Sequence, residues 1–269
     1  MSILNEILEE KQRELTLALS RCSIEDLKVQ ATRYAPLGFL SKLFTSPYPA
    51  VIAEVKRASP SKGIIRADLD PVAVAQSYYN AHAACLSVLT DEKYFKGHAD
   101  ILKSIRLKIP SIPILRKDFT IHAYNIWEAR AWGADAILLI VAALQRESLS
   151  SLLGVAYEAN LDVIVEVHDE VELSLALDVI EKHPETHCAL GINNRNLHTF
   201  ETSLSVTEEL ARVAFSRNPK LSIISESGIV SYEDIKALSA FGSHAFLVGE
   251  SLLRTGNPEE NLKRLRNNH

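Results

Sequence analysis

The chain has 269 residues, of which 47% are hydrophobic and 23% charged, so it has enough apolar material to bury a sizeable core. A net charge of −5 and a pI of about 6.0 exclude the basic footprint typical of nucleic-acid binding, and an anionic ligand would have to be held by local positive groups. No run of about 18 apolar residues predicts a membrane span, so we expect neither nucleic acid nor a membrane as a partner.

The start of the chain and its cysteines favour a cytoplasmic protein. The segment MSILNEILEEKQREL is acidic and amphipathic, and it lacks the basic region and apolar core of a signal peptide. Cys22, Cys85 and Cys188 are far apart, odd in number and without a CxxC pair, which is typical of free thiols in a reducing compartment.

The first 48 residues have helical patterns. Leu4–Leu19 places its apolar residues along one stripe, a second short helix begins at Ser23, and Leu37–Leu40 starts a third. We expect this extension to pack across one end of the domain that follows. The pattern leaves open whether it contributes to function or serves only as a plug.

From residue 51 onward, eight short apolar runs recur along the chain. Each is rich in Ile, Val, Leu and Ala without strict polar alternation, which predicts a strand buried on both faces. The runs are Val51–Val55, Ala84–Leu89, Ile112–Leu115, Ala136–Ile140, Val163–Val167, Cys188–Ile192, Leu221–Ile224 and Ala245–Val248.

Segments of helical length separate these runs. Thr120 can cap a helix that runs through Trp127 and Ala131 and stops at Gly133. Other helix starts are expected at Asp70-Pro71, His168-Asp169-Glu170, Ser231 and Asn257-Pro258.

Strand and helix alternating eight times predict a parallel sheet. Eight units over about 220 residues fit a closed (β/α)8 barrel, the TIM barrel. A doubly wound open sheet is the alternative, but the turn after the first run reads SPSKG, and the motifs GxGxxG and GxxxxGK[ST] are both absent. We therefore predict a single α/β domain over residues 1–269, in which residues 1–48 form an N-terminal helical extension.

Ionic and amide side chains follow the apolar runs, at the strand ends where this fold carries its chemistry. Glu54 and Lys56 are two residues apart and point to the same side of their strand. Buried ions cost several kcal/mol each unless paired, so their recurrence on five strands favours a site over buried salt bridges or solvated charges. The corresponding residues on the other strands are Lys117, Glu166, Asn193 and Glu226.

Such a group of side chains supports acid–base chemistry. A lysine beside other cations and apolar walls can have a lowered pKa, and a glutamate at the end of an apolar strand can have a raised pKa and shuttle protons. The nine histidines show no HxH or HExxH pattern, so we expect no metal. His168 follows Glu166 by two residues, and its position favours a solvated residue at a helix start.

Glycine-containing turns and apolar loop residues indicate where a ligand could lie. Gly228 and Gly249 follow the seventh and eighth runs, where barrels bind phosphate through backbone N–H groups. Ordinary turns also use glycine, and loop packing explains any single apolar residue. Residues that could hold a flat apolar ligand are Pro60, Phe95, Phe119, Leu138 and Leu197.

Seven segments, taken in order, resemble the indole-3-glycerol-phosphate synthase family of tryptophan biosynthesis. They are IAEVKRASPSKG, LSVLTDEKYFKG, ILRKDF, VIVEVHD, GINNRNL, ISESGI and FLVGESL. The resemblance covers essentially the whole chain, including the helical extension. It implies a lyase that converts 1-(2-carboxyphenylamino)-1-deoxyribulose 5-phosphate to indole-3-glycerol phosphate, carbon dioxide and water, with no metal or organic cofactor.

The resemblance also implies residue roles. Lys117 matches the general acid that protonates the substrate carbonyl, and Glu166 matches the general base of the dehydration. Lys56 matches the lysine that pairs with the substrate carboxylate and can share the acid role. The other matches are Glu54, Asn193 and Ser227 for catalysis; Ser59, Pro60, Phe95, Phe119, Leu138, Arg195, Leu197 and Glu226 for substrate binding; and Ser227, Gly228, Gly249 and Glu250 for phosphate, Glu250 through its backbone N–H alone.

Two other hypotheses stay open from the residues. The buried lysines could be nucleophiles of a Schiff-base aldolase acting on a phosphosugar. Alternatively, the barrel could bind a phosphorylated metabolite or a partner without catalysis. We expect a phosphorylated small-molecule substrate at the site, and we expect a monomer or weak homodimer.

Overall fold

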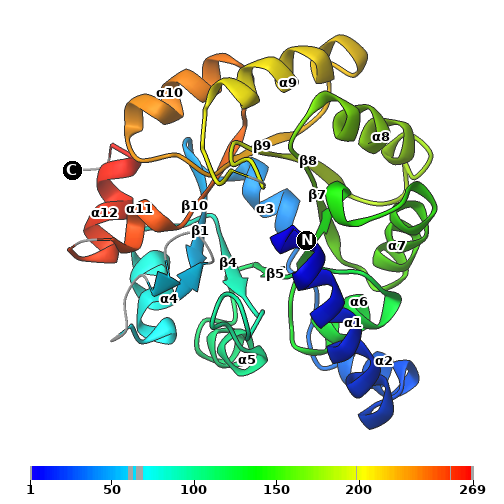
Figure 1. Ribbon diagram of the computed structural model, residues 1–269. Coiled ribbons are helices and arrows are strands. Elements are labelled where there is room, and N and C mark those ends of the chain that lie inside the picture. The colour runs from blue at the N-terminus through cyan, green and yellow to red at the C-terminus, as the bar shows by residue number, and fades with distance from the viewer. Residues whose placement is uncertain (1, 60–62, 65–68, 198, 255, 268–269) are drawn as a thin grey trace.

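The computed structural model describes residues 2–59, 63–64, 69–197, 199–254 and 256–267. Within them, parallel strands close into a barrel in the order β1-β10-β9-β8-β7-β6-β5-β4, and helices surround it (Figure 1). The predicted TIM barrel is therefore confirmed. The barrel strands are β1 (Ala50–Val55), β4 (Cys85–Leu89), β5 (Ile114–Lys117), β6 (Ala136–Ile140), β7 (Asp162–Val167), β8 (Cys188–Asn193), β9 (Ile223–Glu226) and β10 (Ala245–Val248).

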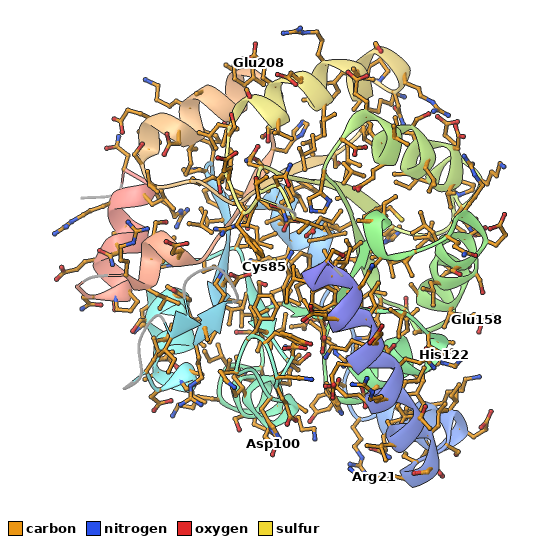
Figure 2. All side chains as sticks on the ribbon, in the orientation of Figure 1. Arg21, Cys85, Asp100, His122, Glu158 and Glu208 are labelled. Carbon is orange, nitrogen blue, oxygen red and sulfur yellow. The ribbon has the colours of Figure 1, made fainter. Side chains whose placement is uncertain are left out.

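The apolar runs form strands because both of their faces are covered. Alternate residues such as Ile52 and Leu138 point into the barrel and pack on one another, while Val51 and Ile137 point outward and pack under the helices. In Figure 2, the labelled Cys85 lies near the centre of the ring, whereas Asp100 and Glu158 lie on the outer helices.

Two strands are displaced from their predicted positions by two residues. The prediction Ile112–Leu115 stops before Arg116 and the prediction Leu221–Ile224 stops before Ser225, whereas β5 and β9 run on through Lys117 and Glu226. Both charged residues still belong to the ladder, because Lys117 pairs with Leu89 and Glu226 with Leu247. A prediction from apolar runs alone therefore ends these two strands too early, because their last residues are polar or charged and lie at the barrel mouth.

The helices begin at side-chain caps at most of the predicted places. The Thr120 cap is wrong: the cap is His122, whose Nδ1 accepts the Tyr124 N–H at 3.1 Å, and Gly133 follows the helix at φ +91°. The helices are α1 (Ile3–Arg21), α2 (Ile24–Ala31), α3 (Phe39–Thr45), α4 (Pro71–Asn80), α5 (Ala99–Lys108), α6 (Ala123–Ala131), α7 (Arg146–Glu158), α8 (Glu170–Ile180), α9 (Ser205–Arg217), α10 (Tyr232–Ala240), α11 (Glu250–Leu253) and α12 (Pro258–Leu265).

Smaller elements lie at the mouth of the barrel. The strands β2 (Ala58–Ser59) and β3 (Gly63–Ile64) form an antiparallel pair after β1, and the short 3-10 helix η1 (Val141–Ala143) follows β6. Among the described helices, none combines the length and apolarity that a membrane crossing requires.

The extension reaches both ends of the barrel, rather than one end as predicted. Phe39 and Leu43 of α3 are fully buried against the first residues of the strands, and the Leu40 N–H donates to Asp162 Oδ2 at 2.7 Å. Helix α2 packs on α6. Helix α1 begins at the opposite end, where Ile3 and Leu4 line the mouth, and Figure 1 shows it running outward from there.

Candidate active site

A cavity of about 360 Å³ opens at the carboxyl end of the barrel. Its volume lies within the usual range of small-molecule sites. Six of the polar residues predicted from the strand ends line it together: Glu54, Lys56, Lys117, Glu166, Asn193 and Glu226. The closed topology explains this convergence, because the carboxyl ends of parallel strands meet around one opening.

Lys117 lies between two buried carboxylates. Its Nζ is 2.7 Å from Glu166 Oε2 and 2.6 Å from Glu226 Oε2. Burial by itself would lower the pKa of the ammonium, but the charges of Glu166, Glu226 and Glu54 outweigh it and raise this pKa well above its ordinary value. The suggested lowering of a lysine pKa is therefore wrong for Lys117, because carboxylates rather than cations surround it.

The two carboxylates have opposite properties. Burial raises the pKa of Glu226 to about 7, although Lys117 opposes the shift. Burial acts in the same direction on Glu166, but Lys117 and His168 reverse it and hold the pKa of Glu166 well below its usual range. Glu166 Oε1 also accepts a hydrogen bond from Asn193 Nδ2 at 3.2 Å. Near neutral pH, Glu166 is therefore ionised while Glu226 titrates.

His168 belongs to this cluster, although its position predicted a solvated residue. Its side chain is only 9% exposed, with Nε2 3.3 Å from Glu166 Oε1 and Nδ1 3.0 Å from Glu172 Oε2. Glu172 lies one turn further along and holds the ring over the end of β7. The spacing of a histidine and a glutamate four residues apart was the signal in the sequence that could have indicated this pair.

Glu54 and Lys56 pair with each other at the end of β1. Lys56 Nζ is 2.5 Å from Glu54 Oε1, and the Glu54 side chain is almost fully buried. A Cβ on Gly249 would lie 2.5 Å from the same oxygen. Gly249 therefore leaves room for the Glu54 carboxylate. The sequence predicted Gly249 only as a phosphate-binding residue and did not indicate this contact.

The predicted apolar residues form one wall of the cavity. Phe95 and Phe119 lie with ring centroids 6.2 Å apart, and Leu138 and Leu197 line the same space. Of the two predicted contacts in the first loop, Pro60 lies outside the described residues, and Ser59 is described only as backbone in β2. The wall also includes Ile3, Leu4 and Ile7 of α1, which the sequence did not assign to the site.

The residues predicted for phosphate lie along another side of the cavity. Ser227, Gly228, Gly249 and Glu250 all line it. Ser227 has φ +69°, a conformation that non-glycine residues rarely adopt and that is often found at functional sites. The Asn194 side chain donates to the Ser227 carbonyl at 3.1 Å and supports this turn.

The side chain of Glu250 pairs with arginines. Arg195 Nη2 lies 3.5 Å from Glu250 Oε2, and Arg254 contacts the other carboxylate oxygen. Because of this pairing, two arginine side chains lie beside the turns that contain Gly228 and Gly249. The pairing is compatible with a phosphate contact made by the Glu250 backbone N–H alone. The described residues include no group of three or more His, Cys, Asp or Glu side chains arranged to hold a metal ion.

Comparison with known proteins agrees with this geometry. The model of the indole-3-glycerol phosphate synthase family matches residues 4–265. The chain belongs to this family. The family resemblance seen in the seven motifs is thereby confirmed.

Relatives of this synthase-family chain match it over nearly its full length. The indole-3-glycerol phosphate synthase of Neisseria meningitidis serogroup C is 42% identical over 267 residues, which is 98% of each chain. That of Acinetobacter baylyi is 43% identical over 259 residues, covering 96% of this chain and 93% of the relative. A solved 3-hexulose-6-phosphate synthase covers 81% of this chain with a TM-score of 0.64, and at 13% identity it shows the fold alone.

A buried ion cluster attaches α1 of this synthase-family chain to the barrel mouth. Lys11 Nζ lies 2.9 Å from both Asp91 Oδ2 and Asp118 Oδ1, which follow β4 and β5. Burial would raise the pKa of Asp118, but Lys11 and Arg116 lower it to about 2. The sequence did not single out this cluster, because its members are far apart along the chain.

Proposed function

We propose that this chain catalyses the family reaction, the conversion of 1-(2-carboxyphenylamino)-1-deoxyribulose 5-phosphate to indole-3-glycerol phosphate, carbon dioxide and water. The observation that carries the proposal is the Lys117 ammonium, held between Glu166 and Glu226 at an apolar cavity. A fixed proton donor and an ionised carboxylate side by side are what an acid–base ring closure requires.

Lys117 is the proposed general acid. As the aromatic carbon attacks the substrate carbonyl, Lys117 Nζ donates a proton to the carbonyl oxygen, which becomes a hydroxyl group. Its raised pKa keeps the ammonium protonated at neutral pH, which is the form that a proton donor needs, and at the same time makes it a weak acid. Lys56 is proposed to pair with the substrate carboxylate in place of Glu54, until that carboxylate leaves as carbon dioxide.

Glu166 is the proposed general base of the second half of the reaction. It removes a proton from the new five-membered ring while Lys56 Nζ donates a proton to the hydroxyl, which leaves as water, and the indole becomes aromatic. The lowered pKa keeps the Glu166 carboxylate ionised, which is the form that a base needs, and at the same time makes it a weak base. Glu54, Asn193 and Glu226 are proposed to orient the lysines and the substrate hydroxyls.

The proposed substrate orientation follows the two sides of the cavity. The anthranilate ring lies against Phe95, Phe119, Leu138 and Leu197, with Ser59 and Pro60 of the first loop as further proposed contacts. The phosphate lies at the turns of Ser227, Gly228, Gly249 and Glu250, with Arg195 nearby. Exposed backbone N–H groups and adjacent arginines are suitable partners for a phosphate.

A Schiff-base aldolase is less well supported. A nucleophilic lysine needs a neutral amine and therefore a lowered pKa. The pKa of Lys117 is raised by its three carboxylate neighbours, which disfavours attack by this amine on a carbonyl.

The test of the proposed function is an indole-fluorescence assay on the purified protein with the ribulose substrate and EDTA present. We expect indole-3-glycerol phosphate to form, and we expect borohydride added with the substrate to trap no adduct on Lys56 or Lys117. Absence of product would contradict the synthase assignment, and a borohydride-trapped lysine would favour the aldolase.

We also propose that residues 1–269 act as one cytoplasmic domain and as a monomer or weak homodimer. The extension supports the first point, because α1 and α3 pack at opposite ends of the same barrel. Cys22, Cys85 and Cys188 are free thiols, which fits a reducing compartment. Sedimentation velocity would measure the oligomeric state.

A further inference from the structure

His168 contacts two carboxylates that come from different elements. It follows β7 directly, and its Nε2 is 3.3 Å from Glu166 Oε1 in the cavity wall. On the other side, Glu172 Oε2 accepts the His168 backbone N–H at 2.8 Å and lies 3.0 Å from Nδ1. Two contacts from one carboxylate oxygen fix the position of the ring, and Nε2 then lies at ion-pair distance from Glu166 without making a hydrogen bond.

The arrangement favours the doubly protonated ring. Nδ1 lies within hydrogen-bond distance of Glu172 Oε2, and Nε2 lies at ion-pair distance from Glu166 Oε1 without making a hydrogen bond. A carboxylate on each side stabilises the imidazolium over the neutral ring. Burial would lower the pKa of His168, but Glu166 and Glu172 outweigh burial and raise it to about 10.

The His168 imidazolium is a second cation, besides the Lys117 ammonium, next to the buried carboxylates. Lys117 of β5 is shared between Glu166 of β7 and Glu226 of β9, and Glu54 of β1 also acts on it. One ammonium cannot neutralise two buried carboxylates, so one of them must carry a proton unless another cation is close. Of the two carboxylates, only Glu166 pairs with His168, while Asn193 of β8 is a neutral partner.

We propose that His168 is a positioning residue that decides which of the two carboxylates in the cluster is the base. The imidazolium fixes Glu166 Oε1 and favours the ionised form of Glu166, and the proton near neutrality resides on Glu226 instead. After Glu166 has accepted a proton in the dehydration, the same positive charge favours release of that proton. This inference rests on the proposed function of Glu166 as base and deepens it.

Two substitutions separate the charge of His168 from its hydrogen bonds. In His168→Gln, the amide nitrogen takes the place of Nε2 beside Glu166. In His168→Asn, it replaces Nδ1 and can donate only toward Glu172. Both variants lack the charge, so we expect the acid limb of the kcat–pH profile to move to higher pH by about one unit or more. We also expect kcat at neutral pH to fall about tenfold in His168→Asn and less in His168→Gln, with KM nearly unchanged.

The matched control is His183→Gln. His183 also lies between two partners, with Nε2 2.8 Å from Ser150 Oγ and Nδ1 3.1 Å from Glu185 Oε1, but it does not line the cavity. We expect this variant to keep the wild-type pH profile. A merely structural role of His168 would instead lower the Tm of both His168 variants and leave their acid limbs at the wild-type pH, which would overturn the proposal.

NMR titration of the imidazole C–H signals tests the proposal without any change at position 168. In the wild-type protein, His168 is expected to titrate near pH 10, and Glu172→Gln is expected to lower that value. Titration at the ordinary histidine value of about 6.5 would overturn the inference. The NMR titration does not depend on turnover. A protein that forms no indole product would refute the proposed function, whereas the titration of His168 would still test whether the ring is an imidazolium.

Discussion

Identical side chains acquire different properties in this cavity through their immediate neighbours. Glu166 and Glu226 both contact Lys117, yet the pKa of Glu166 is lowered and that of Glu226 is raised to about 7. Burial acts to raise both pKa values; the difference follows from His168, which pairs with Glu166, and from the negative charge of Glu166, which raises the pKa of Glu226 further. Two glutamates at equivalent strand ends therefore differ in their protonation near neutral pH.

Gly191 determines where the Glu226 carboxylate lies. It faces the barrel interior on β8, and a Cβ there would lie 2.6 Å from Glu226 Oε1 and 2.7 Å from Ile164 Cγ2. We expect Gly191→Ala to displace the carboxylate, to lower kcat/KM about tenfold or more, and to lower the free energy of unfolding by about 1–3 kcal/mol. Steady-state kinetics and urea unfolding measure both effects.

Gly154→Ala is the control for this substitution. Gly154 lies within α7, and no atom lies within 4 Å of the position that its Cβ would take. Alanine at this helical position is expected to stabilise the protein by about 0.5–1 kcal/mol and to leave the kinetics unchanged. Wild-type kinetics in Gly191→Ala would show that the position of Glu226 does not depend on this glycine.

At the scale of elements, helix α1 connects the extension to the substrate cavity. Its first turns supply Ile3, Leu4 and Ile7 to the apolar wall, and Lys11 fixes the helix to Asp91 and Asp118. The amphipathic stripe predicted this helix, but its position depends on ion pairs between residues far apart in the sequence. Neither periodicity nor capping signals contain that information.

Lys11→Met tests this attachment. The substitution keeps most of the side-chain volume, leaves the buried Asp91 without its cation and leaves Asp118 with Arg116 alone, so we expect the free energy of unfolding to fall by about 3–5 kcal/mol. We also expect KM to rise, because α1 no longer holds its apolar residues against the substrate. Urea unfolding and steady-state kinetics measure these two changes.

Arg13→Met provides the comparison on the same helix. Arg13 is 65% exposed and pairs with Glu10 at 2.9 Å, and exposed pairs of this kind contribute at most about 1 kcal/mol. Equal, small losses in both variants would contradict the proposed role of Lys11 in attaching α1.

At the scale of the whole molecule, the barrel is what the sequence predicted best. The eight apolar runs and the helix signals between them predicted a TIM barrel, because burial of both strand faces leaves a strong local pattern. The polar residues at the strand ends were also predictable, since the fold brings those ends together. The environment of each polar group was not predictable from the sequence. The pKa values of His168 and Lys117 differ from expectation because partners on other elements determine them.

The most direct test of the account is the rate of indole-3-glycerol phosphate formation by Lys117→Met, measured by fluorescence beside the wild type and Lys103→Met. Lys103 pairs with Asp100 on the outer helix α5, at 3.3 Å, and its variant is expected to keep the full rate. Loss of the general acid is expected to lower kcat by about 10²–10⁴-fold in Lys117→Met. The variant also removes the cation between two buried carboxylates, so Tm is expected to fall, and circular dichroism at the assay temperature checks that the protein is folded. A Lys117→Met protein that turns over within about threefold of the wild type would contradict the central claim that Lys117 donates the proton.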